Sequence, residues 1–297
     1  MVGKQERRYQ RMITVVLALI SLIMVIPLVL LVVASFTSNN EIVLHGYSFF
    51  PKELSLEAYR YIWNERAHVF HAYGVTILVT AIGTTIGVMM TLLYAYVLAH
   101  EKFPGKTFLA FYLFFTMLFN GGLVPTYIMY TRYLHMKNTI PALIIPGLLM
   151  SAFNVILTRT YIQSNVPAAL SEAAKIDGAT EFQVFRKVVL PMCKPIIATV
   201  GLFAGLGYWN DWTNGLYYIT DTNKFSIQQL LNNMIKNIEF LSKNANSNIN
   251  LASVGGGIPQ ETVRMAIAIV GLLPILIVFP FVQKYFVKGI SIGAVKG

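Results

Sequence analysis

Residues 12–34 read MITVVLALISLIMVIPLVLLVVA, and no Asp, Glu, Lys or Arg interrupts this run. A helix that rises about 1.5 Å per residue needs about 20 apolar residues to cross the hydrocarbon core of a bilayer. The apolar part of a cleaved secretory signal is usually shorter, about 7–15 residues, and a small-residue cleavage pattern follows it. We therefore expect a retained membrane-spanning helix at 12–34.

The whole chain has the composition of a membrane protein. Of its 297 residues, 56% are hydrophobic and only 12% are charged, whereas soluble proteins average about 25% charged residues. With a mean hydropathy of +0.60, this composition excludes a water-soluble enzyme, and the single Cys193 excludes a disulfide scaffold. The net charge of +10 comes from small groups of Lys and Arg that flank apolar runs. Membrane proteins place them in this way, so we expect no nucleic-acid partner.

Further stretches are long and apolar enough to cross a bilayer. They are residues 73–100, 108–129, 140–158, 195–216 and 265–283. No backbone polar group can stay unpaired in lipid, so each crossing must be helical. We therefore predict an all-α polytopic membrane protein, with six transmembrane helices in a single transmembrane domain over residues 1–297.

The Lys and Arg residues predict the orientation of these spans. Fourteen of the 23 lie in one set of alternating connections, although that set is the shorter one. Cytoplasmic loops carry the excess of Lys and Arg, so this set, and both termini with it, is predicted to be cytoplasmic. Its members are residues 1–11, 101–107, 159–194 and 284–297.

Helix-breaking residues interrupt the spans. Asn120-Gly121-Gly122 breaks the third, and prolines lie in or at the ends of spans at positions 27, 125, 146, 195, 274 and 280. Neighbouring helices or water must satisfy the freed backbone groups, so we expect several helices to face one another around a path. Gly83 with Gly87, and Gly201 with Gly205, place two glycines on one helix face, and we interpret both pairs as helix packing.

The predicted cytoplasmic connection between the fourth and fifth spans contains residues 165–191, NVPAALSEAAKIDGATEFQVFRKVVLP. Pro167 suits a first helical position, and Gly178 suits the left-handed residue that ends a helix. Thr180 and Gln183 have the spacing of a capping box, so a second helix is predicted to begin at once.

This second helix is predicted to present Phe182, Phe185, Val188 and Val189 on one face, as far as Pro191. A simple connection needs only a few residues, whereas this one forms two short helices joined by a glycine turn. We expect the pair to fit a groove on another protein. The alternative is an amphipathic pair that lies in the membrane interface.

The same segment resembles the EAA motif of the membrane subunits of bacterial ATP-binding cassette (ABC) importers. That motif reads E-A-A, three residues, G, nine residues, I, any residue, L-P. The spacing fits throughout, and only Val188 departs, where isoleucine is usual. The longer pattern E-A-A-x-x-D-G-A is similar to the carbohydrate branch, in particular the maltose-type permeases. The matching positions are Glu172, Ala173, Ala174, Asp177, Gly178, Leu190 and Pro191.

The resemblance implies a type I ABC importer permease fold, in a subunit that carries a sugar or oligosaccharide across a bacterial cytoplasmic membrane. Residues 165–191 would be coupling helices, seated in a cleft of an ATP-hydrolysing subunit. The implied partners are two ATP-binding subunits, a second and distinct permease subunit, and an extracellular solute-binding protein. The chain itself would be no enzyme and bind no cofactor, because ATP and Mg belong to the partner subunits.

The predicted cytoplasmic tail, residues 284–297, extends the resemblance. From residue 287 it is similar to the end of the smaller maltose-type subunit, which reaches between the two ATPase subunits. ATPase contacts are therefore implied for Gly293, Val295, Lys296 and Gly297.

Candidate cargo contacts are aromatic residues beside Asn or Asp within spans, because sugars pair C–H surfaces with aromatic faces and hydroxyls with polar side chains. One cluster lies in the third span and one at the outer end of the fifth. The candidates are Asn120, Tyr127, Trp209, Asn210, Asp211 and Trp212. The alternative is structural, since Trp and Tyr collect at membrane interfaces and Asn or Asp can tie helices together.

The predicted outer connections, residues 35–72 and 217–264, are large enough to dock a partner. The resemblance identifies that partner as the solute-binding protein. Solvated loops without a partner are the alternative.

Other functions find little support in the sequence. Gly105-Lys106-Thr107 is no phosphate-binding loop, because His100 stands where that loop requires glycine. The scattered histidines and the single cysteine offer neither a metal site nor a catalytic set. An ion-coupled secondary carrier usually has ionisable groups within its spans, and here only Asp211 qualifies. A membrane enzyme that acts on lipid or glycan would need paired acids or a metal site.

Overall fold

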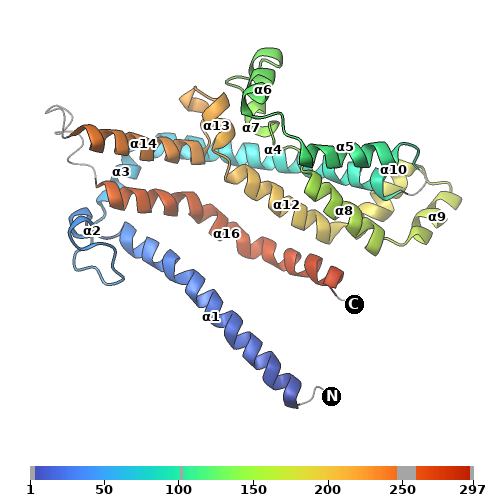
Figure 1. Ribbon diagram of the computed structural model, residues 1–297, viewed down its shortest axis with the longest axis horizontal. Helices are drawn as coiled ribbons and strands as arrows, with labels where there is room; N and C mark the ends of the chain where they lie inside the picture. The colour runs from blue at the N-terminus through green and yellow to red at the C-terminus, as the bar shows by residue number, and fades with distance from the viewer. Residues whose placement is uncertain (1–3, 101–102, 246–258, 295–297) are drawn as a thin grey trace. The chain divides into compact units, whose positions relative to one another are not determined.

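The computed structural model describes residues 4–100, 103–245 and 259–294, which are mostly helical (Figure 1). The chain divides into two compact units, residues 1–69 with 231–274, and residues 70–230 with 275–297. The α-helices are α1 (Lys4–Ser35), α2 (Asn39–His45), α3 (Glu57–Asn64), α4 (Arg66–Ala99), α5 (Lys106–Leu118), α6 (Leu123–Ile128), α7 (Pro141–Ile144), α8 (Ala152–Asn165), α9 (Ala168–Ile176), α10 (Glu181–Val184), α11 (Leu190–Met192), α12 (Lys194–Trp209), α13 (Thr213–Tyr218), α14 (Ile227–Ala245) and α16 (Gln260–Ala294). Two π-helices, η1 (Met129–Tyr133) and η2 (Phe185–Val189), and a 3-10 helix, η3 (Thr222–Lys224), complete the described elements.

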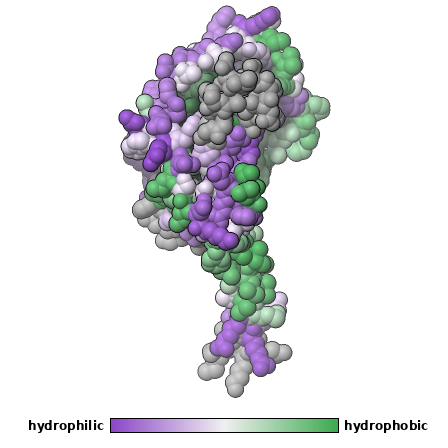
Figure 2. Space-filling model, turned by 90° about the vertical axis from the view of Figure 1, so that its left-hand side faces the viewer, coloured by the Kyte–Doolittle hydropathy of each residue, from purple (hydrophilic) through white to green (hydrophobic). Residues whose placement is uncertain are grey.

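Helix α1 of the first unit contains the predicted first span. None of the residues in its most apolar 18-residue window is buried within the molecule. Figure 2 shows α1 as a continuous hydrophobic stretch that ends in hydrophilic residues toward the N-terminus. A helix that is apolar all round suits lipid, because its hydrogen bonds are internal and its surface has no polar face.

Two carboxylates of the first unit, those of Glu41 and Glu261, accept hydrogen bonds from the connection that follows α1. Glu41 accepts hydrogen bonds from the backbone amides of Lys52 (2.6 Å) and Glu53 (2.5 Å). At the start of α16, Glu261 accepts a hydrogen bond from the Tyr47 hydroxyl (3.0 Å). These bonds fix the connection that follows α1 against the beginning of α16.

The described residues contain fewer unbroken spans than the sequence predicts. Helices α1, α4 and α16 are each long and apolar enough to cross a membrane. Two more candidates are bent: α5 meets α6 and η1 at 114°, and the helix that ends with α11 meets α12 at 81°. The count is therefore three, or up to five if each bent pair is one span. The predicted break in the third span is confirmed, since Gly122 has a φ of +83° and its amide donates to the Asn120 side chain (2.7 Å).

The predicted fourth span is broken rather than continuous. Helix α7 ends at Ile144, and α8 begins only at Ala152. The Ile144 carbonyl accepts a hydrogen bond from the Tyr208 hydroxyl (3.0 Å), and the Pro146 carbonyl accepts one from the Asn214 side chain (3.0 Å). Side chains from later in the chain thus replace helical hydrogen bonds, which makes the break tolerable in an apolar environment.

The helices that contain the predicted fifth and sixth spans end at other residues than those spans. Helix α12 ends at Trp209, and the Asp211 side chain then accepts the backbone amides of Thr213 (3.0 Å) and Asn214 (3.2 Å). Side-chain bonds of this kind start a new helix, here α13. Helix α16 continues beyond the predicted end at 283, through most of the predicted tail.

Both glycine pairs lie at packing contacts, as predicted. The contacts of Gly83, Gly201 and Gly205 join α4 and α12, and Gly87 meets the stretch before α8. A Cβ atom at Gly83 would overlap the ring of Tyr208, and one at Gly87 would lie 2.7 Å from the Leu149 carbonyl oxygen. Gly205 faces the hydroxyl of Thr84 (3.6 Å from an added Cβ). Glycine is needed here for close approach rather than for backbone freedom.

Candidate functional site

The helix pair at 165–191 has the expected hinge. Helix α9 ends before Gly178, which has a φ of +83°, a conformation that glycine adopts without strain. The Ala179 amide then donates to the Ala174 carbonyl (2.9 Å). The predicted capping box is present, because the Gln183 amide donates to the Thr180 hydroxyl (3.3 Å) and the Thr180 amide to the Gln183 side chain (2.9 Å).

The second helix of the pair is anchored in the main apolar core of its unit. Val184, Phe185 and Val189 are buried there together with residues of α4, α8 and α12. The predicted face is partly wrong, since Phe182 is exposed and Val184 is buried in its place. Both residues lie in α10, where positions two apart point to nearly opposite sides of the helix, so burial of Val184 turns Phe182 outward.

The outer side of the pair is open and partly apolar. Ile176 and Phe182 are 86% and 65% exposed, and Leu170 is exposed as well. Of the motif residues, Ala174 and Leu190 are half-buried against the core. The exposed motif residues are Glu172, Ala173, Asp177, Gly178 and Pro191.

A polar cluster that the sequence analysis missed joins the pair to the end of α4. Glu181 pairs with Lys175 (2.5 Å) and accepts a hydrogen bond from the Tyr96 hydroxyl (2.8 Å). His100 lies 3.8 Å from the same carboxylate and 3.3 Å from the Lys175 amine. The ring of Tyr96 also packs against Phe185, with centroids 5.2 Å apart. We call Tyr96, His100, Lys175 and Glu181 the α4–loop cluster.

The surroundings of Glu181 favour its charged form. The hydrogen bond from Lys175 lowers the pKa of this carboxyl below its ordinary value, and the hydrogen bond from Tyr96 acts in the same direction. Desolvation opposes this shift but is outweighed. The carboxylate is therefore ionised at neutral pH and bridges α9, α10 and α4.

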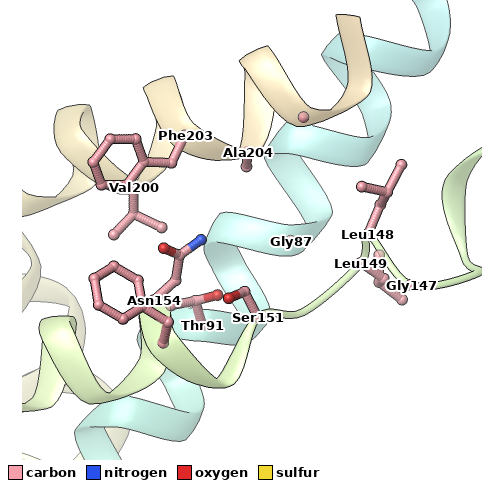
Figure 3. Close-up of a pocket in the computed structure, with 12 residues that line it drawn as sticks. Gly87, Thr91, Gly147, Leu148, Leu149, Ser151, Asn154, Val200, Phe203 and Ala204 are labelled. Carbon is pink, nitrogen blue, oxygen red and sulfur yellow. The ribbon is translucent and has the colours of Figure 1, made fainter. Parts of the chain in front are cut away.

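A cavity of about 370 Å³ lies in the second unit, between α4, α8, α12 and the irregular stretch 145–151 (Figure 3). Most of its lining is apolar, and none of the residues in it is charged. Three polar side chains contribute, Thr91 from α4, Ser151 from the irregular stretch and Asn154 from α8. The other lining residues are Gly87, Gly147, Leu148, Leu149, Phe153, Val200, Phe203, Ala204 and Gly207.

None of the predicted cargo residues lines this cavity. Tyr127 stacks on Tyr218 (5.8 Å between centroids), and Trp209 lies 6.3 Å from the ring of Tyr73. The Asn210 side chain donates to the carbonyl four residues earlier (2.9 Å). The remaining three candidates lie in connections, Asn120 between α5 and α6, and Asp211 and Trp212 between α12 and α13.

The predicted tail contacts are only partly described. Gly293 lies within α16, whereas residues 295–297 lie outside the described ranges. In the described part of the chain, no group of three or more His, Cys, Asp or Glu side chains is arranged to hold a metal ion.

Comparison with known proteins assigns this fold. The profile of the family described as "Binding-protein-dependent transport system inner membrane component" matches residues 2–292. The chain belongs to this family. As a member, this permease is the membrane component of an ABC importer, a multi-pass membrane protein and not the subunit that hydrolyses ATP.

Individual relatives agree with the assignment. The permease is 36% identical to the polygalacturonan/rhamnogalacturonan transport system permease YtcP of Bacillus subtilis (strain 168), over 99% of this chain and 100% of that one. It is 35% identical to Protein LplC of the same organism, over 93% of this chain and 90% of the relative. A crystal structure of a bacterial ABC transporter involved in the import of the acidic polysaccharide alginate matches with a TM-score of 0.75 and 27% identity, over 96% and 99% of the two chains.

These relationships confirm the resemblance found in the sequence. They also give no support to an ion-coupled carrier, because the relatives are permeases of ABC importers.

Proposed function

We propose that this permease forms half of the translocation path of an ATP-driven importer for a sugar or oligosaccharide. Its relatives support a carbohydrate cargo, since they are named for polygalacturonan/rhamnogalacturonan, for arabinooligosaccharides, and for melibiose, raffinose and stachyose. The importer lies in a bacterial cell membrane, where this chain has six spans and both termini are cytoplasmic. The number and placement of Lys and Arg support that orientation.

The proposed partners follow from the family. Two ATP-binding subunits carry ATP and Mg, a second and distinct permease completes the path, and an extracellular solute-binding protein delivers the cargo to the outer connections. The helix pair 165–191 and the tail residues from Gly293 onward contact the ATP-binding subunits. This chain binds no cofactor of its own.

The construction of the helix pair is the observation that carries the proposal. Val184, Phe185 and Val189 of its second helix are buried in the core. Ile176 and Phe182 are exposed on the outer side of the pair. An exposed apolar patch beside a rigid anchor suits a protein partner. A displacement of the pair by the ATP-binding subunit is then passed to α4, α8 and α12, because these helices share one packed core.

Ile176→Asp tests this coupling without disturbing the fold, since the side chain is 86% exposed. Burying an unpaired carboxylate in an apolar groove is costly. In vesicles reconstituted with the whole importer, we expect ATP-dependent sugar uptake to fall at least tenfold, about 1.4 kcal/mol. Ile176→Leu is the matched control, because it keeps an apolar side chain at the same exposed position and should leave uptake unchanged.

Two further variants address the hinge. Gly178→Trp forces a side chain onto a backbone with a φ of +83°, and Glu172→Lys reverses an exposed charge on α9. Both are expected to stay in the membrane and to separate ATP hydrolysis from uptake. Normal uptake by all three variants would contradict the coupling role of the pair.

A further inference from the structure

The cavity between α4, α8 and α12 contains polar groups that the protein leaves unpaired. In the ranges that the structure covers, the side chains of Thr91, Ser151 and Asn154 make no hydrogen bond. Asn154 is only 8% exposed and Thr91 only 2%. Figure 3 shows the Asn154 amide directed toward Val200 of α12, with Thr91 and Ser151 beside it. Ser151 is exposed, and the polar atoms of all three side chains remain accessible from the cavity, so they can form hydrogen bonds with a polar occupant.

The face of α4 that meets the cavity is polar over several turns. Thr80 and Thr84 lie on the same face of the helix as Thr91, and their hydroxyl oxygens are buried without a partner. A polar stripe on a membrane-spanning helix normally faces the protein interior or a cavity rather than lipid.

We propose that this cavity binds an uncharged sugar ring of the transported saccharide. The proposal rests on the importer function proposed above and locates a cargo contact in this chain. A volume of about 370 Å³ lies within the range of small-molecule sites, and a few polar groups in an apolar lining are typical of them. One amide and two hydroxyls supply both donors and acceptors for ring hydroxyls. Phe153 and Phe203 supply aromatic surface for the C–H face of the ring.

The absence of charged side chains in the lining makes the site selective for neutral sugar rings over acidic ones. A carboxylate in this cavity would find no counter-charge among the lining residues, whereas the hydroxyls of a neutral ring can pair with the uncharged polar groups. The cavity therefore accepts neutral rings and rejects uronic acids. This distinguishes it from any site that handles acidic units, such as those of the alginate carried by the structural relative.

A Ser151→Cys variant of the purified importer gives a direct test of occupancy. The chain has only one native cysteine, Cys193, and it is fully buried, so the new thiol is the reactive one in this subunit. We expect excess galactobiose to slow labelling of this subunit by N-ethylmaleimide, and the corresponding digalacturonate to leave it unchanged. Thr85→Cys is the control, because Thr85 is exposed on α4 and lies outside the lining, and its labelling should not respond to either sugar.

Labelling that galactobiose does not slow would overturn the proposal, even if the importer transports sugars. Equal protection by digalacturonate would overturn the selectivity for neutral rings. Protection in an importer that shows no ATP-driven uptake would support the cavity and contradict the importer function. The two proposals are therefore separable.

Uptake kinetics provide the second measurement. Asn154→Leu and Thr91→Val keep the side-chain shape but remove the hydrogen-bonding groups. Each is expected to lower kcat/KM for uptake about three- to tenfold, the effect of one net hydrogen bond. Thr85→Val should leave uptake unchanged, since the Thr85 hydroxyl bonds only to the Ala81 carbonyl of its own helix (2.7 Å). Wild-type kinetics in Asn154→Leu would contradict the proposal.

Discussion

Replacing Glu181 by alanine should loosen the helix pair without unfolding the protein. The ion pair with Lys175 is worth about 0.5 kcal/mol, because the two side chains are 59% and 37% exposed and solvent screens them. The hydrogen bond from Tyr96 to a charged acceptor adds about 1 kcal/mol at this exposure. The sum, about 1–2 kcal/mol, corresponds to a five- to thirtyfold increase in the population with an open α4–loop cluster.

Hydrogen exchange of the backbone amides in residues 168–183 measures this opening. We expect exchange there to accelerate by about five- to thirtyfold in Glu181→Ala, while amides in the core of α4 keep their rates. Glu172→Ala is the matched control, because Glu172 is an exposed carboxylate of the same loop that makes no ion pair within the described chain. The reasoning is refuted if Glu181→Ala exchanges like the wild type, or if both variants accelerate equally.

Three further predictions concern single positions. The pKa of Glu181 is lowered from its ordinary 4.5, so its stabilisation of the helix pair is complete above pH 4.5 and is lost as the pH falls through the lowered pKa. Amide exchange in residues 168–183, corrected for its intrinsic pH dependence, should therefore accelerate only in that acid range. Gly87→Ala places a Cβ 2.7 Å from the Leu149 carbonyl oxygen and should cost about 1–3 kcal/mol of stability. Gly74→Ala, on the same helix but in open space, should not destabilise the protein. Equal Tm values of the two variants in detergent would contradict this difference. Asn138→Ala should cost about 2 kcal/mol, because the residue has a φ of +58° and its side chain accepts two backbone amides, and Asn138→Gly, which keeps the backbone unstrained, should lose less Tm.

Features set by neighbours in the sequence were predictable. The apolar run at 12–34 forms part of α1, and Gly178 and Thr180 take the roles of helix end and helix cap. Each depends on contacts within a few residues, so the local pattern contains the information. The EAA-like segment was the strongest functional signal for the same reason, since its spacing is short and its residue types are specific.

Features set by distant partners were not predictable. Glu181 reads as the start of a helix, and nothing nearby indicates that Tyr96, 85 positions earlier, donates to it. The cavity was missed because Asn154 belongs to α8 and Thr91 to α4, and only packing brings them together. The sequence does contain one signal of it, because the threonines at 80, 84 and 91 lie on one face of an apolar helix.

The ribosome synthesises the broken fourth span before the residues that complete its hydrogen bonds. The groups that satisfy the carbonyls of Ile144 and Pro146 are encoded 64 and 68 positions later. At about 5–20 residues per second, a ribosome delivers Tyr208 and Asn214 roughly 3–14 seconds after the carbonyls emerge. During that interval water or the insertion machinery must solvate them, so this segment enters lipid together with the fifth span rather than before it.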